Sequence, residues 1–256
     1  MATSVLCDMD GVLYRGRALI KGAQEFVDRL LQERIPFLFL TNNSEQTSLD
    51  LQRKLEQLGI RGVTEDNFIT SAMATAMFLK HQNQGSTAYV VGGGGLASEL
   101  YKVGFSISEH RPDYVVVGKT TSLNFDMLRT AVRLISQGAK FIGTNPDVLD
   151  PTPDGIEPAC GSILAAIERA SDRKPYIVGK PNPLMMTIAT RKLRVHAEDT
   201  LMIGDRMDTD IIAGLEAGMK TGLVLSGVTS RDMLEKFPYR PNHIFNHIGE
   251  INPREL

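Results

Sequence analysis

Short apolar runs alternate with longer amphipathic segments along almost the whole chain, and this alternation limits the folds available to it. The apolar runs are expected to be buried strands, at residues 5–7, 37–40, 88–91, 114–117, 141–142, 176–178, 201–203 and 223–225. The segments between them are expected to be helices, at residues 47–58, 71–79, 96–103, 125–136, 162–170, 184–193 and 211–217. Strands that alternate with helices favour parallel sheets with helices on both faces, so the predicted fold class is α/β.

Length and charge exclude several classes of protein. The chain has 256 residues and a formal net charge of -2, so it has the length for one or two domains and lacks the basic character of nucleic-acid binding. No apolar stretch approaches the roughly 20 residues of a membrane span. The only cysteines are Cys7 and Cys160, and Asp8 interrupts the N-terminus before a signal-length apolar region. We therefore expect a cytoplasmic protein with no nucleic-acid or membrane partner, and no feature fixes an oligomeric state.

Polar residues follow four of the expected strands. They are Asp8 with Asp10, Thr41 with Asn42, Lys180, and Asp205. Ligands of open parallel sheets bind beyond the carboxyl ends of the strands, so we expect these side chains to converge on one crevice. Three acids, one cation and a hydroxyl–amide pair suit a phosphoryl group and a divalent metal.

Asp8 and Asp10 are two residues apart at a strand end, so their side chains are expected to point to the same side. Two close carboxylates repel each other and favour a cation beside them, and Mg²⁺ prefers such hard oxygen ligands. Asp205 is a further candidate ligand. An isolated Asp-x-Asp is commonly a solvated turn or a helix cap, but this pair follows a buried strand and precedes Gly11, which favours a functional site.

The residues after the second and third of these strands are candidates for binding an anion. A hydroxyl and backbone N–H groups at the turn of residues 41–44 form an anion site, and the same turn can also cap the next helix. Lys180 stands between glycine and proline, where it can balance phosphate and carboxylate charge, although alone it would be read as an exposed lysine. Asp210, on the first turn of the last expected helix, is predicted to orient Lys180 or metal-bound water.

These four segments resemble, in order, the four motifs of the haloacid dehalogenase superfamily. The matching residues are Asp8-Met9-Asp10-Gly11-Val12, then Thr41, then Lys180, then Gly204-Asp205 with Asp210. Five longer segments are similar to the NagD-type ribonucleotide monophosphatase family, at residues 40–44, 70–74, 144–147, 178–181 and 225–228. The resemblance implies a Rossmann-like core from residues 1–79 and 179–256, and a large inserted α/β cap at residues 80–178 that selects the substrate.

The resemblance also implies a Mg²⁺-dependent phosphatase. Asp8 would attack phosphorus and form an aspartyl-phosphate, and Asp10 would protonate the leaving oxygen and later activate water. Mg²⁺ would be held by the side chains of Asp8 and Asp205 and the backbone carbonyl of Asp10. Thr41, the backbone N–H of Asn42 and Lys180 would hold the transferred phosphate. An acid at Asp10 favours a phosphatase over a dehalogenase, since a dehalogenase has no leaving oxygen to protonate.

The expected substrate is a small phosphate monoester, with ribonucleoside 5′-monophosphates such as UMP as the leading candidate by resemblance. Sugar phosphates, phosphoglycolate and pyridoxal phosphate are the alternatives. Asn145 and Asp147 are candidates to hydrogen-bond the leaving group, but an Asn-Pro-Asp sequence equally favours an Asx-type turn. The loop at residues 158–161 is a second candidate for such contacts.

Other functions remain as alternatives. The glycine-rich turn at residues 92–95 follows an expected strand and opens a helix, as in a dinucleotide-binding site, which makes a NAD-dependent oxidoreductase a remote alternative. A phosphomutase would share the Asp8–Asp10 pair. A binding protein without turnover would require the loss of a motif residue, and none is missing.

Overall fold

The computed structural model describes residues 4–82, 85–152 and 155–255, and the chain forms two compact units. Unit 1 consists of residues 1–41, 48–69 and 180–256, and unit 2 of residues 42–47 and 70–179. Within the described ranges, no helix is both long and apolar enough to cross a membrane.

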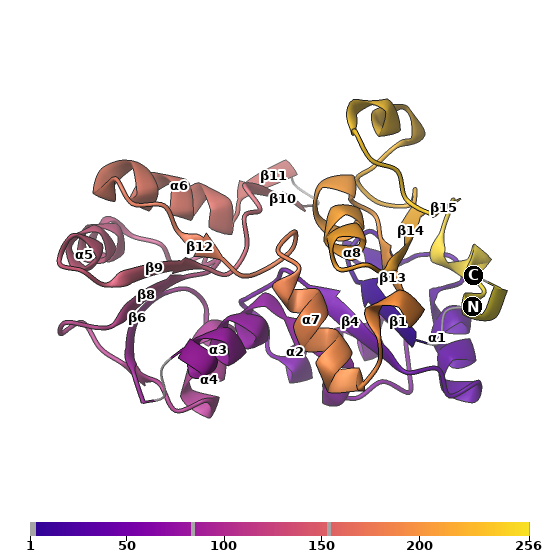
Figure 1. Ribbon diagram of the computed structural model, residues 1–256, viewed down its shortest axis with the longest axis horizontal. Helices are drawn as coiled ribbons and strands as arrows, with labels where there is room; N and C mark the ends of the chain where they lie inside the picture. Colours follow the sequence, from indigo (N-terminus) through magenta and orange to yellow (C-terminus); the bar gives the residue numbers. More distant parts are fainter. Residues whose placement is uncertain (1–3, 83–84, 153–154, 256) are drawn as a thin grey trace. The chain divides into compact units, whose positions relative to one another are not determined.

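A six-stranded sheet forms the centre of unit 1, in the order β15-β14-β13-β1-β4-β5 (Figure 1). Its strands are β1 (Ser4–Asp8), β4 (Phe37–Thr41), β5 (Phe68–Thr70), β13 (Thr200–Gly204), β14 (Lys220–Val224) and β15 (His243–Phe245). β1 pairs in parallel with both β4 and β13. Numbered along the chain, the order is that of a doubly wound 3-2-1-4-5-6 sheet, whose ligand site lies where the strand order reverses. In unit 1 that place is between β1 and β13.

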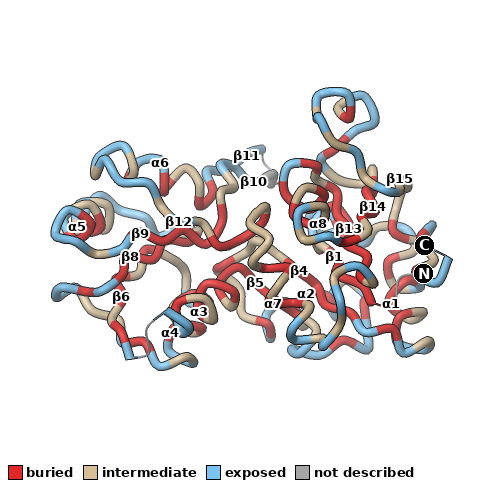
Figure 2. Tube along the Cα trace, in the orientation of Figure 1, coloured by how far each residue is buried: buried red, intermediate tan, exposed pale blue. Residues whose placement is uncertain are grey.

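Helices cover both faces of this sheet. They are α1 (Ala23–Gln32), α2 (Ser48–Leu58), α7 (Leu184–Leu193) and α8 (Ile212–Glu216), with a π-helical turn, η3 (Met207–Ile211), before α8. Alternate strand residues such as Cys7 and Phe39 pack with Phe26 of α1 and Leu55 of α2 in one apolar core. The central strands are buried along nearly their whole length (Figure 2), which explains their continuous apolar sequences. A small hairpin, β2 (Tyr14–Arg15) and β3 (Ala18–Leu19), follows β1.

A five-stranded parallel sheet forms the centre of unit 2, in the order β12-β9-β8-β6-β7. Its strands are β6 (Thr87–Val91), β7 (Ser106–Ile107), β8 (Tyr114–Val117), β9 (Lys140–Gly143) and β12 (Tyr176–Ile177). The helices are α3 (Ser71–Gln82), α4 (Gly94–Lys102), α5 (Phe125–Ser136) and α6 (Cys160–Ser171), and β10 (Leu149–Thr152) pairs antiparallel with β11 (Gly155–Pro158). This is the flavodoxin-like 2-1-3-4-5 order, with its reversal between β6 and β8.

The helices of unit 2 also lie on both faces of their sheet. Val115 and Val117 of β8 pack with Leu134 of α5 and with Ile163 and Ile167 of α6. Figure 1 shows α3 and α4 on the opposite face, and these two helices contact each other. The sequence-based boundary at residue 79 assigns α3 to the core, whereas its contacts group it with unit 2.

The strand that precedes Lys180 belongs to unit 2. β12 is an edge strand of the unit 2 sheet, where Tyr176 pairs with Ile142. It lies within residues 80–178, the range expected for the cap. Lys180 is the first residue of unit 1 after the chain leaves unit 2.

Candidate active site

Two acids lie at the point where the strand order of unit 1 reverses. Asp8 is the last residue of β1, and Asp205 directly follows β13. Cys7 and Ile203 are register partners, so the two acids leave neighbouring strands side by side. A third acid, Asp210, comes from the π-helical turn η3. One carboxylate oxygen from each of the three acids lies within 4.8 Å of the corresponding oxygens of the other two.

Lys180 lies among these acids. Its Nζ donates to Asp8 Oδ1 at 2.5 Å, to Asp210 Oδ1 at 2.7 Å and to the carbonyl of Leu40 at 3.4 Å. Its side chain is only 3% exposed. Burial by itself lowers the pKa of Lys180, but the attraction of Asp210 and Asp8 outweighs burial, so the pKa is raised above its ordinary value. These neighbours therefore favour the charged form of Lys180, which is held beside Asp8.

The charges of this cluster fit a divalent cation. Among the described residues, three clustered carboxylates face the one ammonium of Lys180. Burial, opposed by Lys180, raises the pKa of Asp8 well above its usual value, and burial with the neighbouring Asp210 raises that of Asp205. A cation beside the three carboxylates would favour their ionised forms, and Mg²⁺ is a cation that accepts such oxygen ligands.

Two glycines make room for the carboxylate of Asp205. A Cβ at Gly11 would lie 2.5 Å from Asp205 Oδ2, and a Cβ at Gly227 would be closer still. Gly11 also has a φ of 76°, which favours glycine. The backbone N–H of Val228 donates to the same oxygen at 2.6 Å. Sequence reasoning assigned no role to Gly227 or Val228, although both lie in a segment that it noted.

Asp10 and Thr41 are not members of the three-carboxylate cluster. The side chain of Asp10 is exposed, and its backbone bridges to Tyr14, so it is not one of the three clustered carboxylates. Thr41 is the last residue of β4 and follows Leu40, whose carbonyl accepts from Lys180. The structure thus brings Asp8, Lys180 and Asp210 into direct contact. The expected roles of Asp10 and Thr41 stay predictions.

Asn42 belongs to unit 2 and is held there by hydrogen bonds. Its carbonyl accepts from Ser71 Oγ at 2.6 Å and from Asn145 Nδ2 at 2.7 Å. Its own Nδ2 donates to Asp147 Oδ2 at 2.9 Å. The backbone N–H of Asp147 donates to Asn145 Oδ1 at 3.1 Å, so the Asx-type turn anticipated for residues 145–147 is present. Ser71 was not anticipated as a partner, because nothing local links it to Asn42.

Another segment of the same chain packs against the glycine-rich turn of unit 2. The N–H of Gly95 donates to the carbonyl of Glu45 at 3.0 Å, and a Cβ at Gly95 would collide with that carbonyl. The N–H of Lys119 donates to Ser44 Oγ at 3.1 Å. Residues 42–47, here called the 42–47 segment, therefore lie where the strand order of unit 2 reverses. A dinucleotide would need that same place, so these glycines serve chain packing.

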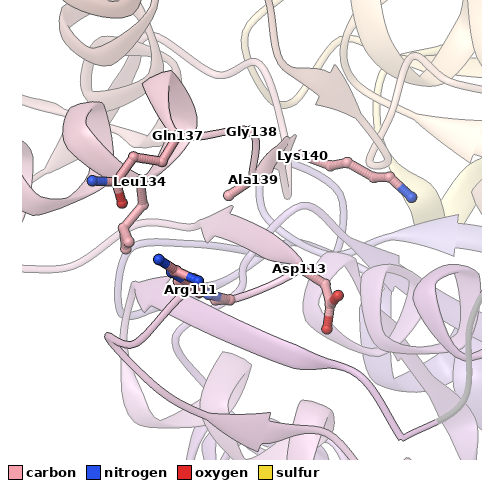
Figure 3. A pocket seen from close by; sticks show the side chains of 8 residues that line it. Arg111, Asp113, Leu134, Gln137, Gly138, Ala139 and Lys140 are labelled. Carbon is pink, nitrogen blue, oxygen red and sulfur yellow. The ribbon is translucent and has the colours of Figure 1, made fainter.

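A cavity of about 590 Å³ opens at the other end of the unit 2 sheet (Figure 3). Its lining includes Arg111, Asp113 and Gln137, and Lys140 at the start of β9. It adjoins the amino ends of β8 and β9, whereas ligands of parallel sheets bind at the carboxyl ends. The cavity holds none of the predicted site residues.

The fold and the acids at its strand ends define the class of protein. A doubly wound core with Asp8 and Asp205 at the reversal point is the arrangement of haloacid dehalogenase-like hydrolases. Residues 5–106 match the family model for haloacid dehalogenase-like hydrolases, and residues 177–251 match a second model of the same kind. The chain belongs to this family, in its NagD-type branch.

Particular relatives cover nearly the whole chain. It is 45% identical to the ribonucleotide monophosphatase NagD of Escherichia coli over 249 residues, which is 97% of this chain and 98% of that protein. It is also 45% identical to a dihydroxyacetone phosphatase of Corynebacterium glutamicum, covering 97% and 90% of the two chains. The solved structure of Escherichia coli NagD superposes with a TM-score of 0.93 at 44% identity, covering 98% and 99%. The protein is therefore a phosphoric monoester hydrolase.

Proposed function

We propose that this protein is a Mg²⁺-dependent phosphatase of ribonucleoside 5′-monophosphates such as UMP, with Asp8 as its nucleophile. The observation that carries the proposal is the placement of Asp8 at the carboxyl end of β1, paired with the buried Lys180. The ammonium opposes the effect of burial and favours the ionised form of the carboxylate, which is the form that acts as a nucleophile.

The metal in this proposal is Mg²⁺, held by the side chains of Asp8 and Asp205 and the backbone carbonyl of Asp10. The cluster of three carboxylates supports this assignment. The ion would supply positive charge that shields the phosphate from the anionic nucleophile. Asp210, which contacts Lys180, is assigned to the support of that lysine.

The reaction would proceed in two steps on this chain's own residues. A carboxylate oxygen of Asp8 forms a bond to phosphorus while the bond to the leaving oxygen breaks, and Asp10 gives its proton to that oxygen. Asp10 then takes a proton from water, which attacks phosphorus and releases Asp8. The exposed side chain of Asp10 suits a group that exchanges protons with leaving groups and water.

The transferred phosphate would be held by Thr41, the backbone N–H of Asn42 and Lys180. These donors stabilise the negative charge spread over the phosphoryl oxygens in the transition state. The Asn42 N–H lies one peptide bond beyond Thr41, the end of β4. Unit 2 is proposed as the cap that selects the leaving group.

The names of relatives support two substrate classes. A ribonucleotide monophosphatase and a 5′-nucleotidase, YutF of Bacillus subtilis, support nucleotides as the first candidate. A dihydroxyacetone phosphatase of equal identity, and several acid sugar phosphatases, support small sugar phosphates as the second. Specificity constants for both classes, with phosphoglycolate and pyridoxal phosphate, would decide between them. The nucleotide assignment fails if any other class exceeds every nucleotide tenfold.

Asp8→Asn tests the nucleophile. The amide cannot form the aspartyl-phosphate, so turnover of p-nitrophenyl phosphate with Mg²⁺ should fall below roughly a few percent of wild type. Asp66→Asn, at an exposed position of unit 1, is the matched control and should keep full activity. Retention of substantial turnover by purified Asp8→Asn protein would rule out Asp8 as the nucleophile.

A further inference from the structure

Asn42 is held by hydrogen bonds through both its carbonyl and its side chain. Two donors, Ser71 Oγ and Asn145 Nδ2, meet its carbonyl, and its side chain donates to Asp147. The preceding residue, Thr41, is fixed as the end of β4. With the side chain, the carbonyl and the preceding residue all held, the torsions of Asn42 have little freedom, and the direction of its N–H is set.

Both N–H donors of the Asn145 side-chain amide are used within the protein. Its Nδ2 donates to the Asn42 carbonyl and to Thr144 Oγ1, while its Oδ1 accepts from the N–H of Asp147. Asn145 is only 4% exposed. A side-chain amide has two N–H donors, and both have partners here. Asn145 is therefore built into the protein rather than offered to a ligand.

The backbone N–H groups of two glycines bind the turn that contains Asn145 and Asp147. The N–H of Gly161 donates to the carbonyl of Asp147 at 2.7 Å, and the N–H of Gly179 donates to that of Thr144 at 2.8 Å. A Cβ at Gly179 would lie 2.8 Å from Asn42 Oδ1. The turn and Asn42 therefore pack as one rigid cluster in unit 2. Asn42 is the first residue of unit 2 and Gly179 is its last, so this cluster includes both ends of unit 2 along the chain.

We propose that Asn145 and Asp147 are positioning residues that orient the Asn42 peptide so that its N–H meets the phosphate of the substrate. They act through Asn42. They do not hydrogen-bond the leaving group, which is the role that the sequence suggested as one possibility. The inference rests on the proposed function, because it takes the Asn42 N–H as a phosphate donor. Such a donor is sensitive to small displacements, since a shift of about 1 Å in an active-site group can cost on the order of a hundredfold in rate.

Asn145→Asp tests the proposal. The carboxylate has the same size and still accepts from the N–H of Asp147, but it removes the donor to the Asn42 carbonyl. We expect kcat/KM to fall roughly ten- to hundredfold, by the same factor for p-nitrophenyl phosphate and UMP. Calorimetric titration with inorganic phosphate and Mg²⁺ should show weaker binding, although phosphate has no leaving group. Asn124→Asp, which keeps its cap to Met127 at an exposed position of unit 2, is the matched control.

Asp147 provides a second pair of variants. Asp147→Asn retains an oxygen that accepts from Asn42 Nδ2 and should keep most of the activity, whereas Asp147→Ala should reproduce the loss. If Asn145→Asp is unfolded at the assay temperature, the two Asp147 variants replace it as the test. Rescue by Asn but not by Ala supports a positioning role.

Three outcomes would overturn the inference. One is a loss confined to one substrate with unchanged phosphate binding, which would indicate contact with the leaving group. Another is unchanged kinetics in both Asn145→Asp and Asp147→Ala, and the third is equal loss in Asp147→Asn and Asp147→Ala. Failure of the proposed function has a different signature, namely no hydrolysis of any phosphate monoester by wild type. The phosphate titration still reports on positioning in that case.

Discussion

Lys180 lies between Asp8 and Asp210 in a site with little access to water. A buried ion pair contributes little net stability, because removing charges from water costs about as much as their attraction returns. Removing the lysine alone is strongly destabilising, because Asp8 and Asp210 are then left buried without a compensating charge. The burial and pairing of Lys180 therefore support the functional role proposed for it.

Lys180→Met should affect both activity and stability. We expect kcat to fall by at least roughly a hundredfold, because the proposed donor to the transferred phosphate is lost. Without metal, the free energy of unfolding should fall by about 3–5 kcal/mol, since Asp8 and Asp210 lose their cation. Urea denaturation in EDTA and in Mg²⁺ measures this, and Mg²⁺ should restore part of the loss. Lys192→Met, at an exposed lysine of unit 1, is the control. A fall in kcat of less than tenfold would contradict the assignment.

Gly227→Ala tests the space around Asp205. The added Cβ collides with the Asp205 carboxylate, so this side chain must move. We expect a fall in kcat of roughly tenfold or more and a higher Mg²⁺ concentration for half-maximal activity. Gly94→Ala, where the Cβ meets open space at the start of α4, should behave as wild type. An unchanged Mg²⁺ requirement would show that Asp205 does not hold the metal.

At the scale of elements, the strongest periodic segments were predictable in detail. The bounds of α5, β8 and α7 coincide with the expected ranges, because each has a continuous apolar pattern with clear ends. The strand β15 was not anticipated, because its three residues are only half-buried and lack a sustained pattern. The expected helix at residues 211–217 is preceded by the π-helical turn η3, which presents Asp210 and has no periodic signature of its own.

The start of β6 is tied to the start of β8 by a pH-sensitive contact. Asp113 Oδ2 accepts from the N–H of Thr87 at 2.8 Å and from its hydroxyl at 3.0 Å. The hydrogen bond from the Thr87 N–H, which favours the ionised form, lowers the pKa of Asp113 in the folded state. Its contribution to stability is therefore present above the unfolded-state pKa of about 3.9 and is lost as pH falls through the lower, folded-state value.

Asp113→Asn should show this dependence. We expect the Tm of the variant to lie about 2–4 °C below wild type near neutral pH, with the difference shrinking as the pH approaches about 3. Thermal denaturation across this pH range measures the difference. Asp126→Asn, at an exposed acid of α5, should change the Tm little at any pH. A difference that grows on acidification would contradict the sign of the effect.

At the scale of the molecule, the chain enters and leaves unit 2 beside residues of the candidate site. Motif residues such as Asp8 and Asp205 could be placed from the sequence, because each follows a recognisable strand. The assignment of the 42–47 segment to unit 2 could not be predicted from the sequence. It depends on contacts with Asn145 and Gly95, two residues that are far from this segment along the chain. Local pattern defines elements, whereas non-local packing decides which unit an element joins.

The two units have separate cores, so core truncations should act locally. Ile167→Ala removes a fully buried side chain of unit 2 and should cost about 2–5 kcal/mol. Hydrogen exchange should become faster in β8 and β9 and stay unchanged in β1 and β13. Leu55→Ala, in the core of unit 1, is the reciprocal control and should show the opposite pattern. Equal acceleration in both units for either variant would show that they unfold together.

The 42–47 segment has a consequence for engineering chimeric phosphatases. A specificity graft that replaces residues 70–179 alone would surround the resident Asn42, Ser44 and Glu45 with foreign partners. The transferable module is therefore discontinuous in the gene and consists of residues 42–47 together with residues 70–179. Recombination libraries that use a single crossover pair would separate the two pieces, whereas libraries that move both should preserve the hydrogen bonds at the junction.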